Sequence, residues 1–321
     1  MTGLSCPRFA HFCMLCVPLL ETTTVNPRNQ TLKIRPRRSL LYMPGSNARA
    51  LDKARSLPAD GLILDLEDAV APDAKELARE QIGTALAEGG YGHRELIVRI
   101  NGLDTEWGHD DIAAVSGFAT APDGLLVPKI NFASDVTDAI AAIDGAGCSK
   151  NIGIWLMAET PHCMLNIGEI AAAHPRVVGM VMGTSDLSKD TRVRHTRDRL
   201  GFIGALNLCV YAARAHELII IDGVQLDLED EETLRYSCEQ GRDLGFDGKS
   251  LIHPKQIAVT NGTFAPDAAE ITAARDVIAA FEEAQAQGKA VVVVKGRLVE
   301  NLHVEEARRQ LALAEAIEQM A

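Results

Sequence analysis

Three carboxylates stand directly after a short apolar run in the stretch GLILDLEDAVAPDAK. Asp65, Glu67 and Asp68 follow residues 61–64, whose apolar and branched side chains are typical of a strand buried on both faces. Carboxylates are rarely buried unless they are paired or bind a metal, so this group at a strand end indicates a functional site. The alternative is a solvated loop that leads into a helix, and Asp73 suits the first turn of such a helix.

Two further acids, Glu159 and Asp186, end apolar runs that are neighbours in the chain. If those runs are adjacent strands, the two carboxylates meet, and two oxygen ligands completed by water are the arrangement that Mg²⁺ favours. Mn²⁺ is an expected substitute. Two structural alternatives remain open, in which Glu159 caps the next helix and Asp186 forms an Asx turn. No Cys/His cluster stands near these acids, which disfavours zinc.

Two basic residues, Arg99 and Lys129, also follow apolar runs. Arg99 has two compatible roles, to neutralise Asp65 or Glu67 in a buried pair and to hold a carboxylate or carbonyl oxygen of a substrate. Lys129 has the position of a Schiff-base lysine, but neighbouring carboxylates would keep its amine protonated and a poor nucleophile.

The elements that must position these residues are eight short apolar runs, which alternate with segments of helical periodicity. This alternation predicts repeated βα units and a closed parallel (β/α)₈ barrel, whose chemistry lies at the carboxyl ends of the strands. A doubly wound open sheet is the rival fold, but residues 44–47 do not form the expected G-x-G-x-x-G. The predicted strands are residues 39–43, 61–64, 96–100, 124–128, 152–158, 177–182, 218–221 and 248–252.

Two segments flank the predicted barrel. Residues 38–262 are predicted to form the barrel, and residues 263–321 a helical extension that acts as a lid or an oligomer contact. Residues 1–37 are interpreted as a disordered leader, with a targeting peptide as the alternative because residues 9–20 resemble a short signal-peptide core. That apolar run is too short to span a bilayer, so no membrane is expected.

Composition excludes several classes of partner and compartment. A net charge of −12 and an aromatic content of 4% provide neither a basic stripe nor stacking platforms, which excludes nucleic acid as a partner. The seven cysteines are scattered and odd in number, unlike a secreted disulfide framework. We therefore expect a cytoplasmic protein, or an organellar-matrix protein if the leader is a targeting peptide.

The chain resembles the citrate lyase β-subunit-like, or HpcH/HpaI aldolase, family, which includes malyl-CoA and citramalyl-CoA lyases. This resemblance implies a Mg²⁺-dependent barrel, a homo-oligomer of three or six subunits, and an acyl-CoA and a small 2-oxo acid as partners. The similar stretches are RSLLYMPGSNARALDKA, GLILDLEDAVAPDAKELAR, LIVRIN, LLVPKI, MAET, GTSDLS and IHPKQI.

By matching motif, the resemblance implies that Glu159 and Asp186 bind the metal and that Arg99 faces the reacting oxygens. It also implies that Glu67 and Asp68 order Arg99 and the metal-bound waters. For the substrate it implies contacts with the following basic residues, of which the first two lie toward the CoA phosphates: Arg38, Lys53 and Lys129.

The expected reaction is reversible Claisen-type cleavage of a 3-hydroxyacyl-CoA of the malyl-CoA or citramalyl-CoA class. The alternatives are a malyl-CoA-type thioesterase, a metal-dependent 2-oxo-acid aldolase without CoA, and a non-catalytic protein that binds a CoA thioester or oxo acid. One residue departs from the family pattern: Lys295 stands where malyl-CoA lyase-like members carry an aspartate implicated in acid/base chemistry at a neighbouring subunit. Another base, a different chemistry, or contact of Lys295 with a CoA phosphate would account for it.

Overall fold

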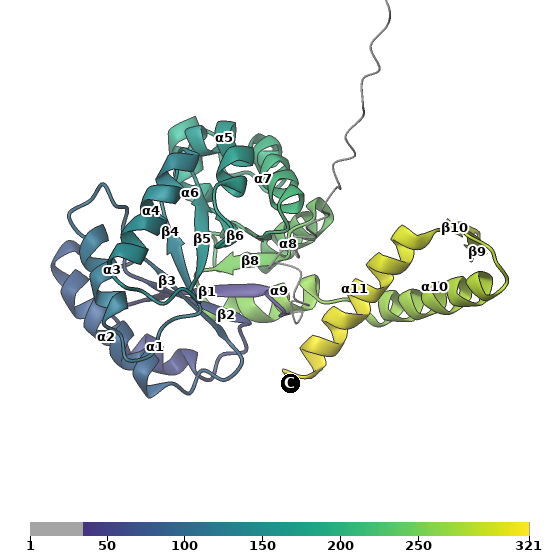
Figure 1. Ribbon diagram of the computed structural model, residues 1–321, viewed down its shortest axis with the longest axis horizontal. Helices are drawn as coiled ribbons and strands as arrows, with labels where there is room; N and C mark the ends of the chain where they lie inside the picture. Colours follow the sequence, from purple (N-terminus) through teal and green to yellow (C-terminus); the bar gives the residue numbers. More distant parts are fainter. Residues whose placement is uncertain (1–34, 321) are drawn as a thin grey trace, which may run out of the picture. The chain divides into compact units, whose positions relative to one another are not determined.

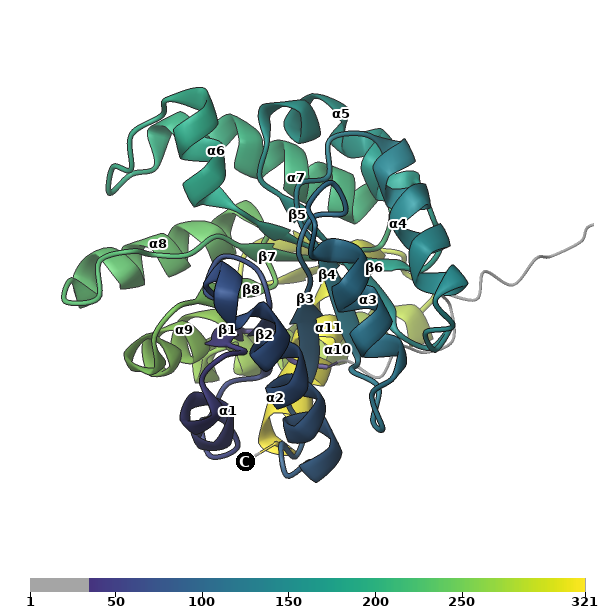
Figure 2. The same cartoon turned by 90° about the vertical axis from the view of Figure 1, so that its left-hand side faces the viewer.

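Eight parallel strands close into a barrel in the computed structural model, which describes residues 35–320 (Figures 1 and 2). Each strand pairs with its neighbour in the chain, and β1 pairs with β8 to close the ring. The predicted (β/α)₈ barrel is confirmed. The strands are β1 (Ser39–Pro44), β2 (Gly61–Asp65), β3 (Glu95–Arg99), β4 (Gly124–Val127), β5 (Gly153–Ala158), β6 (Val177–Met182), β7 (Ile219–Asp222) and β8 (Gly248–Leu251).

Helices surround the strands and bury their apolar faces against the outside of the barrel (Figure 2). They are α1 (Ala48–Ala54), α2 (Lys75–Glu88), α3 (Gly108–Ser116), α4 (Ala133–Gly145), α5 (Pro161–Ala172), α6 (Thr184–Thr191), α7 (Ile203–Ala215), α8 (Glu231–Leu244) and α9 (Ile257–Phe264). Short 3₁₀ helices cover Pro72–Ala74, Leu200–Phe202 and Pro254–Gln256. The segments of helical periodicity recognised in the sequence did not include α3, α6 or α9. In α6 only Thr184 and Leu187 are buried, so this helix carries no apolar stripe that periodicity can detect.

The barrel interior is filled by side chains below the carboxyl ends of the strands. Trp155 of β5 is fully buried among apolar residues contributed by other strands of the barrel. The large indole requires glycine on the next strand, because a Cβ at Gly179 would lie 2.5 Å from Trp155 Cζ3. The guanidinium of Arg37 lies 5.7 Å from the centre of the Trp155 ring, at the amino-terminal end of the barrel. Polar side chains therefore have room for chemistry only at the opposite end.

Buried ion pairs hold β7 against β8. Asp222 of β7 accepts a hydrogen bond from Lys249 Nζ at 2.8 Å and two from Arg199 Nη1, at 2.8 and 2.7 Å. All three side chains are buried, and the two cations lower the pKa of Asp222 although burial opposes this effect. Each charge is compensated, as burial requires. This network uses Asp222, so its carboxylate is not free for chemistry.

The C-terminal extension has a small apolar core of its own. It contains α10 (Ala268–Ala286), the hairpin of β9 (Val292–Val294) and β10 (Arg297–Val299), and α11 (Asn301–Glu318), drawn in light green to yellow in Figure 1. Phe281, Val299 and Val304 pack together there, separately from the barrel core. In the described part of the chain, no helix is long and apolar enough to cross a membrane.

Candidate active site

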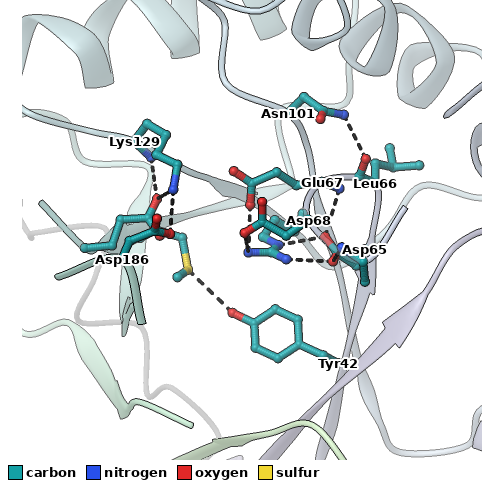
Figure 3. Close-up of polar contacts among 12 residues, drawn as sticks. Tyr42, Asp65, Leu66, Glu67, Asp68, Asn101, Lys129 and Asp186 are labelled. Carbon is teal, nitrogen blue, oxygen red and sulfur yellow. Dashed lines mark hydrogen bonds and ion pairs between the residues drawn. The ribbon is translucent and has the colours of Figure 1, made fainter. Parts of the chain in front are cut away.

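Glu159 and Asp186 follow the carboxyl ends of β5 and β6, and both lie beside one ammonium group, that of Lys129. Figure 3 shows Lys129 next to Asp186. Lys129 Nζ lies 2.6 Å from Asp186 Oδ2 and 3.5 Å from Glu159 Oε1. The fold thus brings together two acids that are far apart in the chain.

Backbone geometry fixes the position of Glu159. Lys129 has a left-handed backbone with φ of 57°, and its N–H donates a hydrogen bond to Glu159 Oε1 at 2.8 Å. Gly183 leaves room on the other side, because a Cβ there would lie 2.7 Å from Glu159 Oε2. Glu159 does not cap helix α5; the cap is Thr160, whose side chain accepts from the Cys163 N–H. Asp186 lies in the first turn of α6 rather than in an Asx turn.

Electrostatics differ between the two acids because Glu159 is buried and Asp186 is partly exposed. Burial, together with the charge of Asp186, raises the pKa of Glu159 against the opposing effect of Lys129. Burial would also raise the pKa of Asp186, but hydrogen bonds from Lys129 and Glu159 lower it. In turn these carboxylates raise the pKa of Lys129 despite its desolvation. Its amine is therefore protonated and unsuited to Schiff-base formation.

The pair of carboxylates fits a hard divalent cation. Both offer oxygen ligands, and an ammonium group already lies between them, which shows that the position attracts a cation. Within residues 35–320, no group of three or more His, Cys, Asp or Glu side chains is arranged to hold a metal ion. A bound ion would therefore take its remaining ligands from water and substrate, as Mg²⁺ usually does.

Arg99 is held in the same hollow by the acids of the β2–α2 loop. Its Nε and Nη2 donate to the two carboxylate oxygens of Asp65 at 2.7 and 2.6 Å, and Nη1 lies 2.7 Å from Glu67 Oε2. Asp68 is farther, at 3.7 Å from Nη1, and is mostly exposed. The structural role expected for Arg99 is thus present, and its remaining N–H groups are available for another oxygen.

Glu67 has a strongly perturbed ionisation. Burial raises its pKa to about 8, against the lowering effect of Arg99. Its buried Oε2 makes an ion pair with Arg99 but has no hydrogen-bond partner among the described residues. A buried acid with a pKa near neutrality and an unused acceptor is a candidate for proton transfer.

Lys75 anchors the loop that carries these acids. Its buried Nζ donates to the carbonyl oxygens of Leu66 and Glu67 at 2.7 and 2.8 Å and to Asn101 Oδ1 at 2.8 Å. The same ammonium lies 5.0 Å from the centre of the Trp107 ring. Lys75 was not predicted from the sequence, because a lysine at the start of an amphipathic helix is usually solvated. Its position seven residues after Asp68 was the one feature that linked it to the acids of the site.

A cavity of about 660 Å³ opens beside these residues. It is lined by Glu67, Asp68 and Lys129 from the site and by loop residues that include Trp107 and His162. A second cavity, of about 300 Å³, lies on the β6–β7 side and includes Thr184 and Arg199. The first has the size of a small-molecule site.

The basic residues expected to meet CoA phosphates lie elsewhere. Arg38 precedes β1 at the amino-terminal rim, where its Nε and Nη2 donate to the carboxylate of Asp60 at 2.9 and 2.8 Å. The expectation for Arg38 is therefore not met within this chain, because it occupies the opposite end of the strand from the site. Lys53 is exposed in the last turn of α1 and lines neither cavity.

Lys295 is a turn residue of the C-terminal hairpin. Lys295 and Gly296 have φ values of 48° and 80°, the positive pair that a two-residue hairpin turn requires. Lys295 Nζ lies 2.7 Å from Asp276 Oδ2 of α10. The side chain is therefore paired within the extension and lines neither cavity of its own chain.

Comparison with known proteins finds a family match over the residues of the barrel. The family model described as HpcH/HpaI aldolase/citrate lyase matches residues 38–254. The chain belongs to this family.

Members of this family differ in the reactions for which they are named. A (3S)-malyl-CoA thioesterase of Cereibacter sphaeroides (strain KD131) is 54% identical over 283 residues, which cover 88% of this chain and 96% of that protein. An L-malyl-CoA/β-methylmalyl-CoA lyase of the same species is 34% identical over 305 residues, with 88% and 96% covered. A solved structure is also similar, that of CitE from Mycobacterium tuberculosis in complex with magnesium, acetoacetate and coenzyme A. Its sequence is 27% identical to this chain, and the match has a TM-score of 0.72 and covers 88% of this chain and 100% of that one.

Proposed function

We propose that the protein is a Mg²⁺-dependent thioesterase that hydrolyses a 3-hydroxyacyl-CoA of the malyl-CoA class. The metal part of the proposal is supported by the convergence of Glu159 and Asp186 on one cation position. The observation that favours hydrolysis over carbon–carbon cleavage is the identity of 54% with a malyl-CoA thioesterase, against 34% with a malyl-CoA lyase. The thioesterase expected as an alternative thus replaces the lyase as the leading reaction.

In this mechanism Glu159 and Asp186 hold the metal and thereby position the hydroxy-acid end of the substrate. Bound Mg²⁺ supplies positive charge that orients the oxygens of this end and polarises them. The free edge of Arg99, fixed by Asp65 on its other side, faces the thioester carbonyl oxygen and stabilises the negative charge that develops there. Lys129 stays protonated and would bind a substrate carboxylate.

Glu67 moves the proton in this proposal. Water attacks the thioester carbon and gives its proton to Glu67, whose pKa of about 8 suits a base near neutral pH. A bond forms between the water oxygen and the carbonyl carbon, and the carbon–sulfur bond then breaks. Glu67 returns the proton to the CoA sulfur, so the products are the free hydroxy diacid and CoA. Asp68, exposed at the cavity mouth, orders water nearby.

Carbon–carbon cleavage is the second candidate, because the same groups would serve it and a relative named as a lyase spans 88% of the chain. Arg99 would then stabilise the enolate oxygen of the departing acyl-CoA instead of the hydrolytic oxyanion. An oxo acid would leave in place of a hydroxy acid, and the thioester would stay intact.

One assay separates the two reactions. The protein is incubated with malyl-CoA and Mg²⁺ or Mn²⁺, and free thiol is measured with a thiol reagent while glyoxylate is measured as a hydrazone. Hydrolysis releases thiol without glyoxylate, and cleavage releases glyoxylate and acetyl-CoA without thiol. Binding of malyl-CoA without either product would instead support a binding protein, and absence of CoA-ester binding a CoA-independent aldolase.

The matched variants are Glu159→Gln and Glu169→Gln, the second at an exposed position on α5. We expect Glu159→Gln to lose activity by about a hundredfold or more, because one metal ligand is neutralised. Equal metal-dependent activity in the two variants would refute the metal assignment.

A further inference from the structure

Tyr42 is a polar side chain beside Arg99 in the barrel interior. It lies on the inner face of β1 and packs against the apolar cluster that fills the barrel. Its neighbours Leu41 and Met43 point to the other face of the strand and are buried. Tyr42 itself keeps partial exposure although it points inward.

The phenol makes close contact with the groups of the site. The guanidinium of Arg99 lies 4.9 Å from the centre of the Tyr42 ring, which stacks beneath it. The charges of Arg99, Asp65, Glu159 and Glu67 all act on the hydroxyl. Figure 3 shows Tyr42 below the space that separates Lys129 and Asp186 from Asp65 and Glu67. Tyr42 therefore forms part of the floor of the site.

Among residues 35–320, the hydroxyl of Tyr42 has no strong hydrogen-bond partner. It contacts the thioether of Met157, 3.6 Å from Oη to Sδ, and a thioether is a weak acceptor. Burial raises the pKa of Tyr42, so the hydroxyl remains a donor throughout the physiological range. Buried hydroxyl groups normally find oxygen or nitrogen partners, and an exception inside a reactive hollow indicates a ligand.

We propose that Tyr42 Oη donates a hydrogen bond to an oxygen of the hydroxy-acid or oxo-acid end of the substrate. This inference rests on the proposed function. The acid end is the part that reaches the floor, because the long CoA chain must leave through the mouth while Glu159 and Asp186 hold the short end. Tyr42 is thus a binding residue that selects substrates with an oxygen at this depth.

The test compares Tyr42→Phe with Tyr91→Phe, using oxaloacetate as the probe. Tyr91 is the control, because its hydroxyl already donates to the Leu51 carbonyl oxygen at 3.0 Å and so has an oxygen partner within the protein. Calorimetry in Mg²⁺ measures the Kd for oxaloacetate in both variants and in the wild type. We expect Tyr42→Phe to raise this Kd by about tenfold or more, the value of a hydrogen bond to a charged oxygen. Tyr91→Phe should lower Tm and leave the Kd unchanged.

The result does not depend on which reaction the enzyme catalyses. If the wild type binds oxaloacetate and Tyr42→Phe weakens it, the role of Tyr42 stands even when malyl-CoA is not hydrolysed. Equal affinity in the wild type and Tyr42→Phe overturns the inference, and so does absence of oxaloacetate binding by the wild type. If malyl-CoA is hydrolysed, kcat/KM for malyl-CoA should fall in Tyr42→Phe more than kcat/KM for succinyl-CoA, which has one oxygen less.

Discussion

Arg99 and Asp65 form a two-point pair at the carboxyl ends of two adjacent strands, with Nε to Oδ1 at 2.7 Å and Nη2 to Oδ2 at 2.6 Å. The two residues are directly opposite each other in the register of β2 and β3. The register of the sheet therefore fixes the orientation of the guanidinium plane. This geometry explains why a buried strand ends in a carboxylate, since Asp65 orients the buried guanidinium.

Arg99→Lys should reduce kcat by about a hundredfold or more. A lysine keeps the charge but cannot bond Asp65 at two points and still present a donor to a substrate oxygen. Arg38→Lys is the matched control, because Arg38 forms the same kind of pair with Asp60 at the opposite rim. Steady-state thiol release measures both. If the two variants retain equal turnover, Arg99 does not act on the reacting oxygens.

Lys75→Met should destabilise the protein by about 1–3 kcal/mol, because the Glu67 carbonyl and Asn101 Oδ1 lose their buried donor. Activity should fall as well, since the loop that holds Glu67 against Arg99 loses its anchor. Urea unfolding measures the free energy of unfolding, and Lys53→Met at an exposed position should change it by less than about 0.5 kcal/mol. A neutral effect of Lys75→Met on both stability and activity would contradict the anchoring role.

Without bound metal, the free energy of unfolding should fall as pH rises from about 5 to 8. Burial raises the pKa of Glu67 from 4.5 to about 8, so over this interval the native state keeps a proton that the unfolded chain has released. The unfolded state binds fewer protons, which makes the slope of unfolding free energy against pH negative, and the loss is complete above the folded pKa. Unfolding in EDTA at a series of pH values measures this contribution.

Glu67→Gln is the control for this pH effect, because glutamine cannot titrate. As pH rises from about 5 to 8, the free energy of unfolding of the wild type should fall relative to that of Glu67→Gln. Parallel profiles for the two proteins would mean that Glu67 ionises normally in the folded state.

The barrel could be predicted because its strands carry their own signal. Apolar runs such as residues 177–182 are buried on both faces, and the observed β6 has the same bounds. Helix α6 left no comparable signal, because it follows the site directly and is held by Gly183 and the loop rather than by an apolar face. Tertiary contacts decide such an element, and a single sequence does not display them.

Charged residues directly after a buried apolar run are rare, so the sequence can single out such positions. Glu159 and Arg99 both fit that rule. Tyr42 and Lys75 did not, because a tyrosine in a strand and a lysine in an amphipathic helix match ordinary patterns. The role of Tyr42 depends on the groups near its hydroxyl, and the role of Lys75 depends on the loop that it holds. Both are set by distances across the barrel. Arg38 shows the converse, since a motif residue lies at the wrong end of its strand to meet the site.

Lys129→Met should increase the affinity for Mg²⁺. The ammonium lies 2.6 Å from Asp186 Oδ2 and 3.5 Å from Glu159 Oε1, so a metal ion must displace a positive charge that already neutralises both ligands. The backbone N–H that positions Glu159 remains in the variant. Methionine keeps the chain length without the charge, and the Kd for Mg²⁺ should fall by about tenfold or more, because unit charges at this separation interact by more than 1.4 kcal/mol. Calorimetric titration measures the change, with Lys53→Met as the control. Weaker Mg²⁺ binding in Lys129→Met would instead mean that the lysine supports the metal site, and the ion would then have to lie beside the ammonium rather than in its place.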